Sequence, residues 1–286
     1  MIGALRTHWP EYLMEAAELG LFMVSAGLFG TLLEYPQSPV HRAIADPLVR
    51  RVIMGVAMGL TAVGIIYSAW GKQSGAHFNP AVTLTFWRLG KVAGWDALCY
   101  LAAQFAGGLA GVLLVAAILG DWFLAPPVAA VATVPGAQGA AAAFVAEAAM
   151  TFLLMLMVLC VSNSARIARY TGLGVGLLLA AYIILEAQLS GTSMNPARTF
   201  ASALPGNTWT ALWVYYTAPP LGMLAAAQTY LWLRGRGAVY CAKMHHQNNK
   251  RCIFCAYRAA SQPEEPASKS SPTDINSSAT RDLAVR

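Results

Sequence analysis

What the chain has least of is charge. Only 11% of its 286 residues are Asp, Glu, Lys or Arg, whereas 57% are hydrophobic. Soluble domains carry roughly 25% charged residues, so a chain this apolar cannot fold as one soluble globule. Its long runs without charge predict a protein whose solvent is lipid.

Cysteine is also scarce. The five cysteines are too few and too scattered for the disulfide framework of a secreted domain; they are Cys99, Cys160, Cys241, Cys252 and Cys255. Cations are missing where a cleavable signal would carry them, because Glu11, Glu15 and Glu18 open the first apolar run. We therefore expect that run to stay as a spanning helix.

No nucleophile–base pair or cofactor-binding loop stands out, so we expect no enzymatic activity. The net charge of +6 is concentrated in the loops and the tail that flank apolar segments. Membrane orientation explains that distribution better than a nucleic-acid surface would, and no nucleic-acid partner is predicted.

Six apolar runs are long enough to cross a bilayer. They lie near 11–33, 51–71, 95–120, 140–162, 171–190 and 209–233. The sequence thus predicts an all-α membrane domain over 1–235, a Cys/His segment over 236–260 and a disordered tail over 261–286. If the N-terminus is cytoplasmic, four of the 19 Lys and Arg residues (Arg42, Arg50, Arg51 and Arg198) lie outside and the other 15 inside. That asymmetry predicts that both termini are cytoplasmic.

An internal repeat organises the membrane domain. Ser74-Gly-Ala-His-Phe-Asn-Pro-Ala81 is echoed by Ser190-Gly-Thr-Ser-Met-Asn-Pro-Ala197, within halves that cover about 10–120 and 140–235. Each half has three spans, an odd number, so the second half must be inverted relative to the first. Inverted repeats place their functional site near the membrane midplane.

The two Asn-Pro-Ala triplets each precede a short apolar stretch. These stretches are too short to span and too apolar for water, which predicts two re-entrant half-helices buried in protein. Asn caps helices and Pro opens them, so Asn79-Pro80-Ala81 and Asn195-Pro196-Ala197 should start the half-helices head to head. Two helix N-termini concentrate positive potential at the membrane midplane, which opposes the passage of cations. The Asn amides can donate hydrogen bonds to a passing water.

The two motifs, with Arg198 directly after the second, resemble the signatures of the aquaporin, or major intrinsic protein, family over roughly 10–235. The resemblance is closer to the water-channel branch than to the glycerol facilitators. It implies a homotetramer in the lipid bilayer with a pore in each subunit, and a channel for water and small neutral solutes that needs no cofactor.

The same resemblance implies a selectivity filter. Arg198 matches the filter arginine, Thr192 the small loop position and Ile183 the fifth-span position, while the second-span position falls on Gly59 or Met58. Water-selective members carry His and Phe where this chain has Ile183 and Gly59 or Met58, which favours a wider, less polar constriction. Thr199 and the pair Tyr215-Tyr216 differ from the glycerol-conducting pattern. We expect water, with ammonia or hydrogen peroxide as additional solutes.

Buried ionisable groups in spans are usually functional. Glu18 and Glu147 follow Ala in matching places of the two halves, so we expect them to accept hydrogen bonds from the re-entrant loops rather than to relay protons. His77 is expected to position its loop. Glu186 has no counterpart in the first half, and either supports the loop before Asn195 or faces the pore.

The tail carries a feature that the resemblance does not explain. Cys241, His245, Cys252 and Cys255 could form a tetrahedral zinc site, or less readily hold an iron–sulfur cluster. The alternative is a basic segment whose cysteines are free or lipidated. A metal-dependent gate is one hypothesis for a metal in this place.

Three other functions remain open at this stage. An ion-coupled transporter also uses inverted repeats, but it needs coupling carboxylates where this chain has amides. A metal or redox sensor on a channel-like scaffold would depend on the tail cysteines, and a glycerol or small-polyol facilitator would use the same pore.

Overall fold

The computed structural model describes residues 2–255, and every regular element within that range is helical. Six long helices form the body of the described chain: α1 (Ile2–Glu34), α3 (Pro47–Tyr67), α6 (Gly94–Leu119), α8 (Gly139–Ser162), α9 (Thr171–Ser190) and α11 (Leu212–Arg234). The tail expected to be disordered, 261–286, lies outside the described residues.

Shorter helices connect the long ones. The connectors are α2 (Pro39–Ala43), α4 (Ala69–Ser74), α7 (Asp121–Leu124) and the 3-10 turns Ala129–Val131, Ala168–Tyr170 and Arg236–Ala238. The expected half-helices are α5 (Pro80–Arg88) and α10 (Pro196–Ala203). With nine and eight residues, neither can cross a bilayer.

The long helices match the spans expected from hydropathy. In the part of the chain that the structure describes, five are long and apolar enough to cross a membrane: α1, α3, α6, α8 and the helix that ends at Ser190. The sixth, α11, has 23 residues but contains Pro219 and Pro220 and falls outside that group by composition. It packs on α8 as α6 packs on α1, so it completes the bundle.

Helix pairing follows the inverted repeat. The extensive pairs α1–α6 and α8–α11 are equivalent, and α3 packs on its own counterpart α9. Each half-helix packs against the last long helix of the other half, α5 on α11 and α10 on α6. The two halves are therefore interlocked through the half-helices, which also contact each other.

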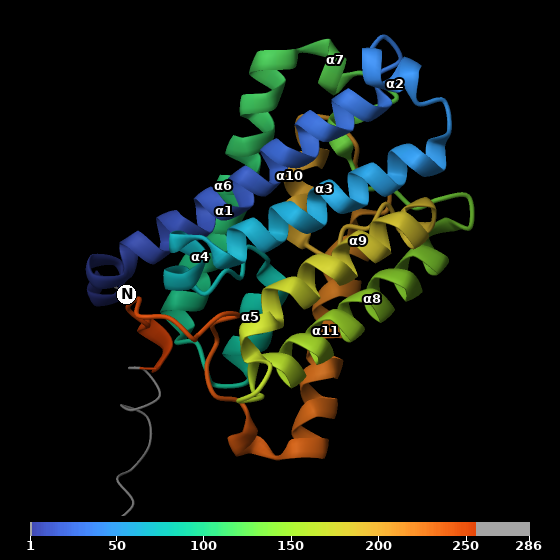
Figure 1. The fold of residues 1–286 in the computed structure, drawn as a ribbon. Helices are drawn as coiled ribbons and strands as arrows, with labels where there is room; N and C mark the ends of the chain where they lie inside the picture. Colours follow the sequence, from blue (N-terminus) through green and yellow to red (C-terminus); the bar gives the residue numbers. More distant parts are fainter. Residues whose placement is uncertain (1, 256–286) are drawn as a thin grey trace, which may run out of the picture.

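The bundle has two different ends (Figure 1). The open face carries the end of α1, α2 and the start of α3; the tail face carries the start of α1 and residues 239–255, which return to it after α11. The loop between α4 and α5 lies on the tail-face side, because Gly75 and His77 bond to residues 242–244.

Two crossings between the long helices are so close that they require glycine. A Cβ at Gly107 on α6 would come within 2.0 Å of the Ala16 carbonyl oxygen on α1. A Cβ at Gly59 on α3 would come within 2.5 Å of the Gly176 carbonyl oxygen on α9. Backbone lies opposite backbone at both crossings, which is typical of membrane helix pairs.

Gly107→Val should therefore destabilise the bundle by about 1–3 kcal/mol or more, because the opposing atom is backbone and cannot rotate away. Thermal unfolding in detergent would measure the loss. Gly64→Ala is the matched control, since nothing lies within 4 Å of the Cβ it would add. Equal melting temperatures for the two variants would contradict the close α1–α6 contact.

Candidate functional site: a pore built on two half-helices

The two half-helices begin at the Asn-Pro pairs. The Asn79 Oδ1 accepts from the Ala81 amide at 2.9 Å, and the Asn195 Oδ1 accepts from the amides of Ala197 and Arg198 at 3.0 and 3.2 Å. Pro80 and Pro196 are the first helical residues, where a missing N–H removes no helical bond. Both half-helices thus start as the sequence predicted.

The same asparagines tie the two loops together. The Asn79 Nδ2 donates to the Met194 carbonyl at 2.8 Å, and the Asn195 Nδ2 donates to the Phe78 carbonyl, also at 2.8 Å. An amide nitrogen carries two hydrogens, so this crossed pair uses one from each asparagine and leaves the other available to a solute. The asparagines are 7% and 6% exposed, so they keep a small accessible surface at the junction.

The two loops share an unusual backbone. Ala76 and Phe78 have positive φ angles of 57° and 30°, and Thr192 and Met194 have 52° at the equivalent positions. None of the four is glycine, so these conformations cost energy that their surroundings must offset. Sequence reasoning missed them because nothing in these residue types marks a left-handed backbone.

Two buried glutamates hold these loops. Glu147 accepts from the amides of Ser193 and Met194 at 2.7 and 2.6 Å and from the Ser190 hydroxyl at 2.7 Å. Glu15 accepts from the equivalent amides of His77 and Phe78 at 2.8 and 2.7 Å. Glu15, on α1, therefore makes the backbone bonds equivalent to those of Glu147, which the sequence had assigned to Glu18.

Glu18 makes one hydrogen bond to the loop of the first half. Its Oε1 accepts from the Ser74 hydroxyl at 2.7 Å, a bond that Glu147 makes to Ser190 in the second half. One turn of α1 separates Glu15 from Glu18, so the first half divides between two carboxylates what Glu147 does alone. Gln104 on α6 adds a donor to Glu15 at 2.7 Å.

His77 and Glu186 both lie beside their loops. His77 is 1% exposed, and its ring is hydrogen-bonded to the Thr83 hydroxyl at 3.0 Å and to the Ala242 carbonyl at 2.8 Å. Glu186 accepts from the Thr192 hydroxyl at 2.9 Å and is not among the residues that line the cavity. This geometry corresponds to the loop-support alternative for Glu186.

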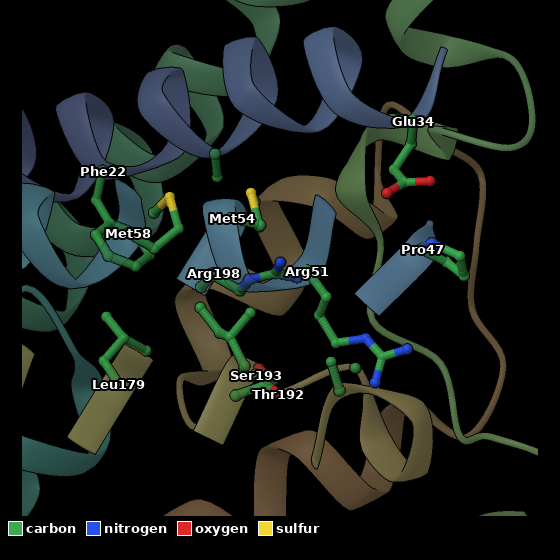
Figure 2. Close-up of a pocket in the computed structure, with 14 residues that line it drawn as sticks. Phe22, Glu34, Pro47, Arg51, Met54, Met58, Leu179, Thr192, Ser193 and Arg198 are labelled. Atoms are coloured by element: carbon green, nitrogen blue, oxygen red, sulfur yellow. The ribbon is translucent and has the colours of Figure 1, made fainter. Parts of the chain in front are cut away.

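A cavity of about 330 Å³ leads from the open face toward the loops. Arg198, Thr192, Ile183 and Met58 line it, whereas Gly59 packs against α9. Of the two residues left open for the second-span position, Met58 is the one that lines the cavity. Figure 2 shows Met58, Thr192 and Arg198 around this space.

Arg198 projects from the first turn of α10 and is 9% exposed. Its Nη1 is buried and has no hydrogen-bond partner among the described residues. Arg51 and Glu34 line the same cavity nearer its mouth, and Ser193 lines it beside Thr192 (Figure 2). Sequence reasoning placed Arg51 on the outer side but did not connect it with the pore.

A second cluster lies on the tail face, outside the membrane helices. The ligand atoms of Cys241, His246, Cys252 and Cys255 all lie within 4.8 Å of one another. His246, not the predicted His245, completes the set; the His245 ring instead meets Tyr67 with centroids 5.0 Å apart. The hydrogen bond shared with Cys241 lowers the pKa of the Cys252 thiol and raises that of Cys241.

A helical bundle with two half-helices meeting inside it is the architecture of a pore-forming membrane protein. The sequence profile of the major intrinsic protein family matches residues 7–230. The chain belongs to this family, so it is a multi-pass membrane protein of a channel family and not an enzyme.

Similar proteins include aquaporin NIP2-1 of Zea mays, 37% identical over 180 residues, which cover 63% of this chain and 59% of the relative. The probable aquaporin AqpM of Archaeoglobus fulgidus is 37% identical over 195 residues, covering 63% of this chain and 75% of AqpM. The chain spans about 60% of the length of the maize relatives that it matches.

Among solved structures, the aquaglyceroporin of Plasmodium falciparum superposes with a TM-score of 0.65. The match covers 78% of this chain and 96% of the aquaglyceroporin at 21% sequence identity. The likeness establishes the aquaporin fold, with its inverted repeat and half-helices.

The loop contacts predict unequal effects for the glutamates of α1. Glu15→Gln should lower the free energy of unfolding by about 1–3 kcal/mol. The glutamine side chain would place an NH2 group against the amide of His77 or Phe78, and that amide would lose its acceptor. Glu18→Gln should cost less, because the Ser74 hydroxyl can rotate to another partner. Thermal unfolding in detergent would compare them, and a costlier Glu18→Gln would refute the assignment of Glu15.

Proposed function

We propose that the chain is a passive channel for water and other small neutral solutes, among them ammonia and hydrogen peroxide, and that it excludes protons and ions. The observation that carries this proposal is the crossed pair of asparagines at the start of the two half-helices. Each Asn amide has one N–H left for a passing water, and both helix dipoles direct positive potential at the same point.

Ion exclusion would combine these dipoles with the fixed charge of Arg198. Aquaporins are themselves the standard example of selectivity by half-helix dipoles and an arginine. A water that accepts from both asparagines is oriented so that it cannot pass a proton along the file. Arg198 offers donors to a solute oxygen and a barrier to cations on the open-face side.

The remaining filter positions favour a broader range than water alone. Ile183 and Met58 add apolar surface to the cavity beside the polar groups of Thr192 and Arg198. Thr199 is bonded to the Thr133 and Ser193 hydroxyls, so it supports the second loop rather than the permeation path. Glycerol conduction is the alternative outcome, and a homotetramer with cytoplasmic termini is the assembly we propose.

The first test is osmotic shrinkage of proteoliposomes by stopped flow, with a parallel set loaded with a pH dye. We expect water flux far above bare lipid, at low activation energy and without a proton leak. Arg198→Ala should keep water flux and raise the leak of protons or small cations about tenfold, the effect of about 1.4 kcal/mol removed from the barrier. The channel proposal would be refuted if water flux were no faster than through bare lipid under every condition in which the protein is tested.

The residues lining the cavity also lead to a prediction about which solute sizes can pass. Ile183→His should reduce glycerol and urea uptake by roughly tenfold relative to water, because a polar ring replaces one apolar side of the cavity. Ile183→Val, which keeps that side apolar, is the matched control. Light scattering with each solute gives the ratio of permeabilities, and an unchanged ratio would remove Ile183 from the filter.

A further inference from the structure

Residues 239–255, here called the closing segment, cover the re-entrant loop on the tail face. The Met244 amide donates to the Gly75 carbonyl at 3.1 Å. The Ala242 carbonyl accepts from the Nε2 of His77 at 2.8 Å, two residues before Asn79. The segment therefore bonds directly to the loop that presents the first pore asparagine.

Phe254 extends this contact into the same loop. Its ring stacks on His77 with centroids 5.5 Å apart and an interplanar angle of 10°, and Phe86 of α5 stacks on His77 at 5.3 Å. Phe254 is 2% exposed and His77 is 1% exposed. Water cannot reach the His77 ring from the tail face while Phe254 holds this place.

The closing segment is anchored to the tail face at several points. The Tyr240 amide donates to the Asn163 Oδ1 at the end of α8 at 2.6 Å, and the Arg251 guanidinium donates to the Thr7 carbonyl on α1 at 2.6 Å. The Arg251 Nε also lies 3.5 Å from the Glu11 carboxylate. Together with the bond to the loop at Gly75, these contacts reach from α1 to the end of α8.

Little regular structure holds this segment in shape. Within the described residues 239–255, the only helical stretch is 253–255. Short segments of this kind generally need a disulfide or a metal to stay folded. The Cys241 and Cys252 sulfurs are 3.5 Å apart, far longer than a disulfide bond, and Cys255 lies 3.6 Å from Cys241.

These separations fit tetrahedral zinc. Zn–S bonds of about 2.3 Å in a tetrahedron place two sulfurs roughly 3.8 Å apart. The His246 Nε2 lies 3.1 Å from the Cys255 sulfur, so an imidazole supplies the fourth position. Three thiolates and one histidine form a closed set of the structural kind, with no position left for a substrate.

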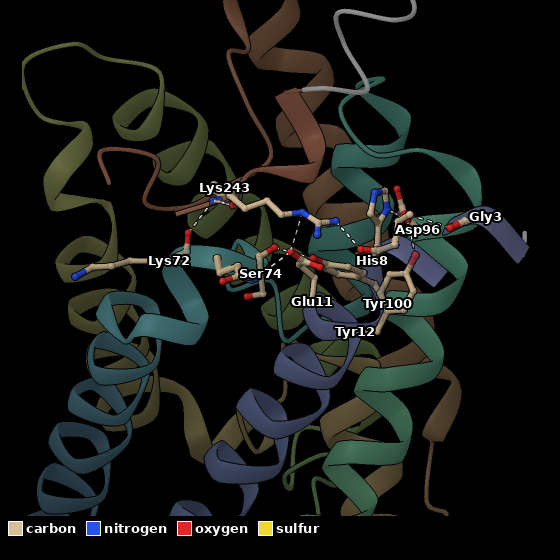
Figure 3. Close-up of polar contacts among 12 residues, drawn as sticks. Gly3, His8, Glu11, Tyr12, Lys72, Ser74, Asp96, Tyr100 and Lys243 are labelled. Carbon is tan, nitrogen blue, oxygen red and sulfur yellow. Dashed lines mark hydrogen bonds and ion pairs between the residues drawn. The ribbon is translucent and has the colours of Figure 1, made fainter. Parts of the chain in front are cut away.

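A buried lysine supports an anionic centre there. Lys243 is 2% exposed, and its ammonium donates to the backbone carbonyls of Lys72 and Arg251 at 2.8 and 2.6 Å (Figure 3). Three thiolates around Zn²⁺ leave the complex one net negative charge, which would compensate the buried ammonium.

We propose that Cys241, His246, Cys252 and Cys255 bind one Zn²⁺, and that the metal holds the closing segment shut over the tail-face mouth of the pore. The closure depends on the proposed channel function, whereas the metal site does not. Loss of the metal removes the link between the three cysteines and His246, and the segment then leaves His77 and opens the mouth.

The metal site is tested first on the full chain in detergent under reducing conditions. We expect one Zn²⁺ per chain by elemental analysis, and a thiolate-to-metal absorption band when Co²⁺ replaces it. Cys252→Ser should abolish both signals, whereas Cys160→Ser, a cysteine outside the cluster, should keep both. Binding of less than about one fifth of an equivalent, or equal binding in Cys252→Ser, would overturn the site.

Closure is tested by stopped-flow water flux in proteoliposomes with Zn²⁺ or a strong chelator on both sides. The zinc-loaded protein should conduct at least about tenfold less than the chelated protein, because metal binding shifts the opening equilibrium. Cys252→Ser should conduct fast in both conditions. Phe254→Ala should keep one Zn²⁺ and still conduct fast, because the metal remains while the ring over His77 is lost.

The outcomes separate the two proposals. Equal fast flux with zinc and with chelator, in a protein that binds one Zn²⁺, would overturn the gate and leave the channel intact. No flux above bare lipid from chelated protein, Cys252→Ser or Phe254→Ala would overturn the gate and the channel together.

Discussion

The rest of the structure depends on one constraint, the pairing of non-helical backbone inside a membrane. The two re-entrant loops bring amides and carbonyls to a depth where water is scarce and where each unpaired group costs several kcal/mol. Glu15 and Glu147 accept the loop amides, and the crossed asparagines donate to the loop carbonyls of Phe78 and Met194. The long helices are placed so that these bonds can form: the carboxylates come from α1 and α8, the first helix of each half. The interlocked half-helices then follow, because each loop must meet the other at the junction.

Much of this arrangement could be predicted from the sequence because its signals are local. Asn-Pro opens a helix wherever it occurs, and the number of spans between two copies determines that one copy is inverted. The partner of Glu147 could not be predicted in the same way. Glu15 and Glu18 lie on the same side of α1, one turn apart, and the shared Ala-Glu pair favoured Glu18. Only the register of α1 against the loop at His77 decides between them, and that register is a tertiary contact that one sequence does not reveal.

Tertiary contacts also decide between two pairs of neighbouring residues, Met58 and Gly59 in the cavity and His245 and His246 in the cysteine cluster. Met58 and Gly59 differ by 100° around α3, and the packing of Gly59 against the α9 backbone turns Met58 toward the cavity. Sequence spacing alone allowed both. His245 and His246 belong to a segment with almost no regular structure, where no periodicity gives the direction of a side chain. In this segment, ring contacts determine which histidine faces the cysteines. His245 packs on Tyr67, whereas His246 packs on Tyr240 beside the cysteines.

The backbone of the two loops is symmetric, but their surroundings are not. His77 and Ser193 occupy equivalent positions, two residues before their asparagines, and each gives its amide to a glutamate. Ser193 lines the open-face cavity, whereas His77 is covered by Ala242 and Phe254. A regulator on the tail face would therefore contact the His77 loop and not the Ser193 loop. Glu15 and the crossed asparagines hold the His77 loop by bonds that do not involve the closing segment. Its contacts can be lost while the junction stays intact, which is the condition that a removable cover on a pore must meet.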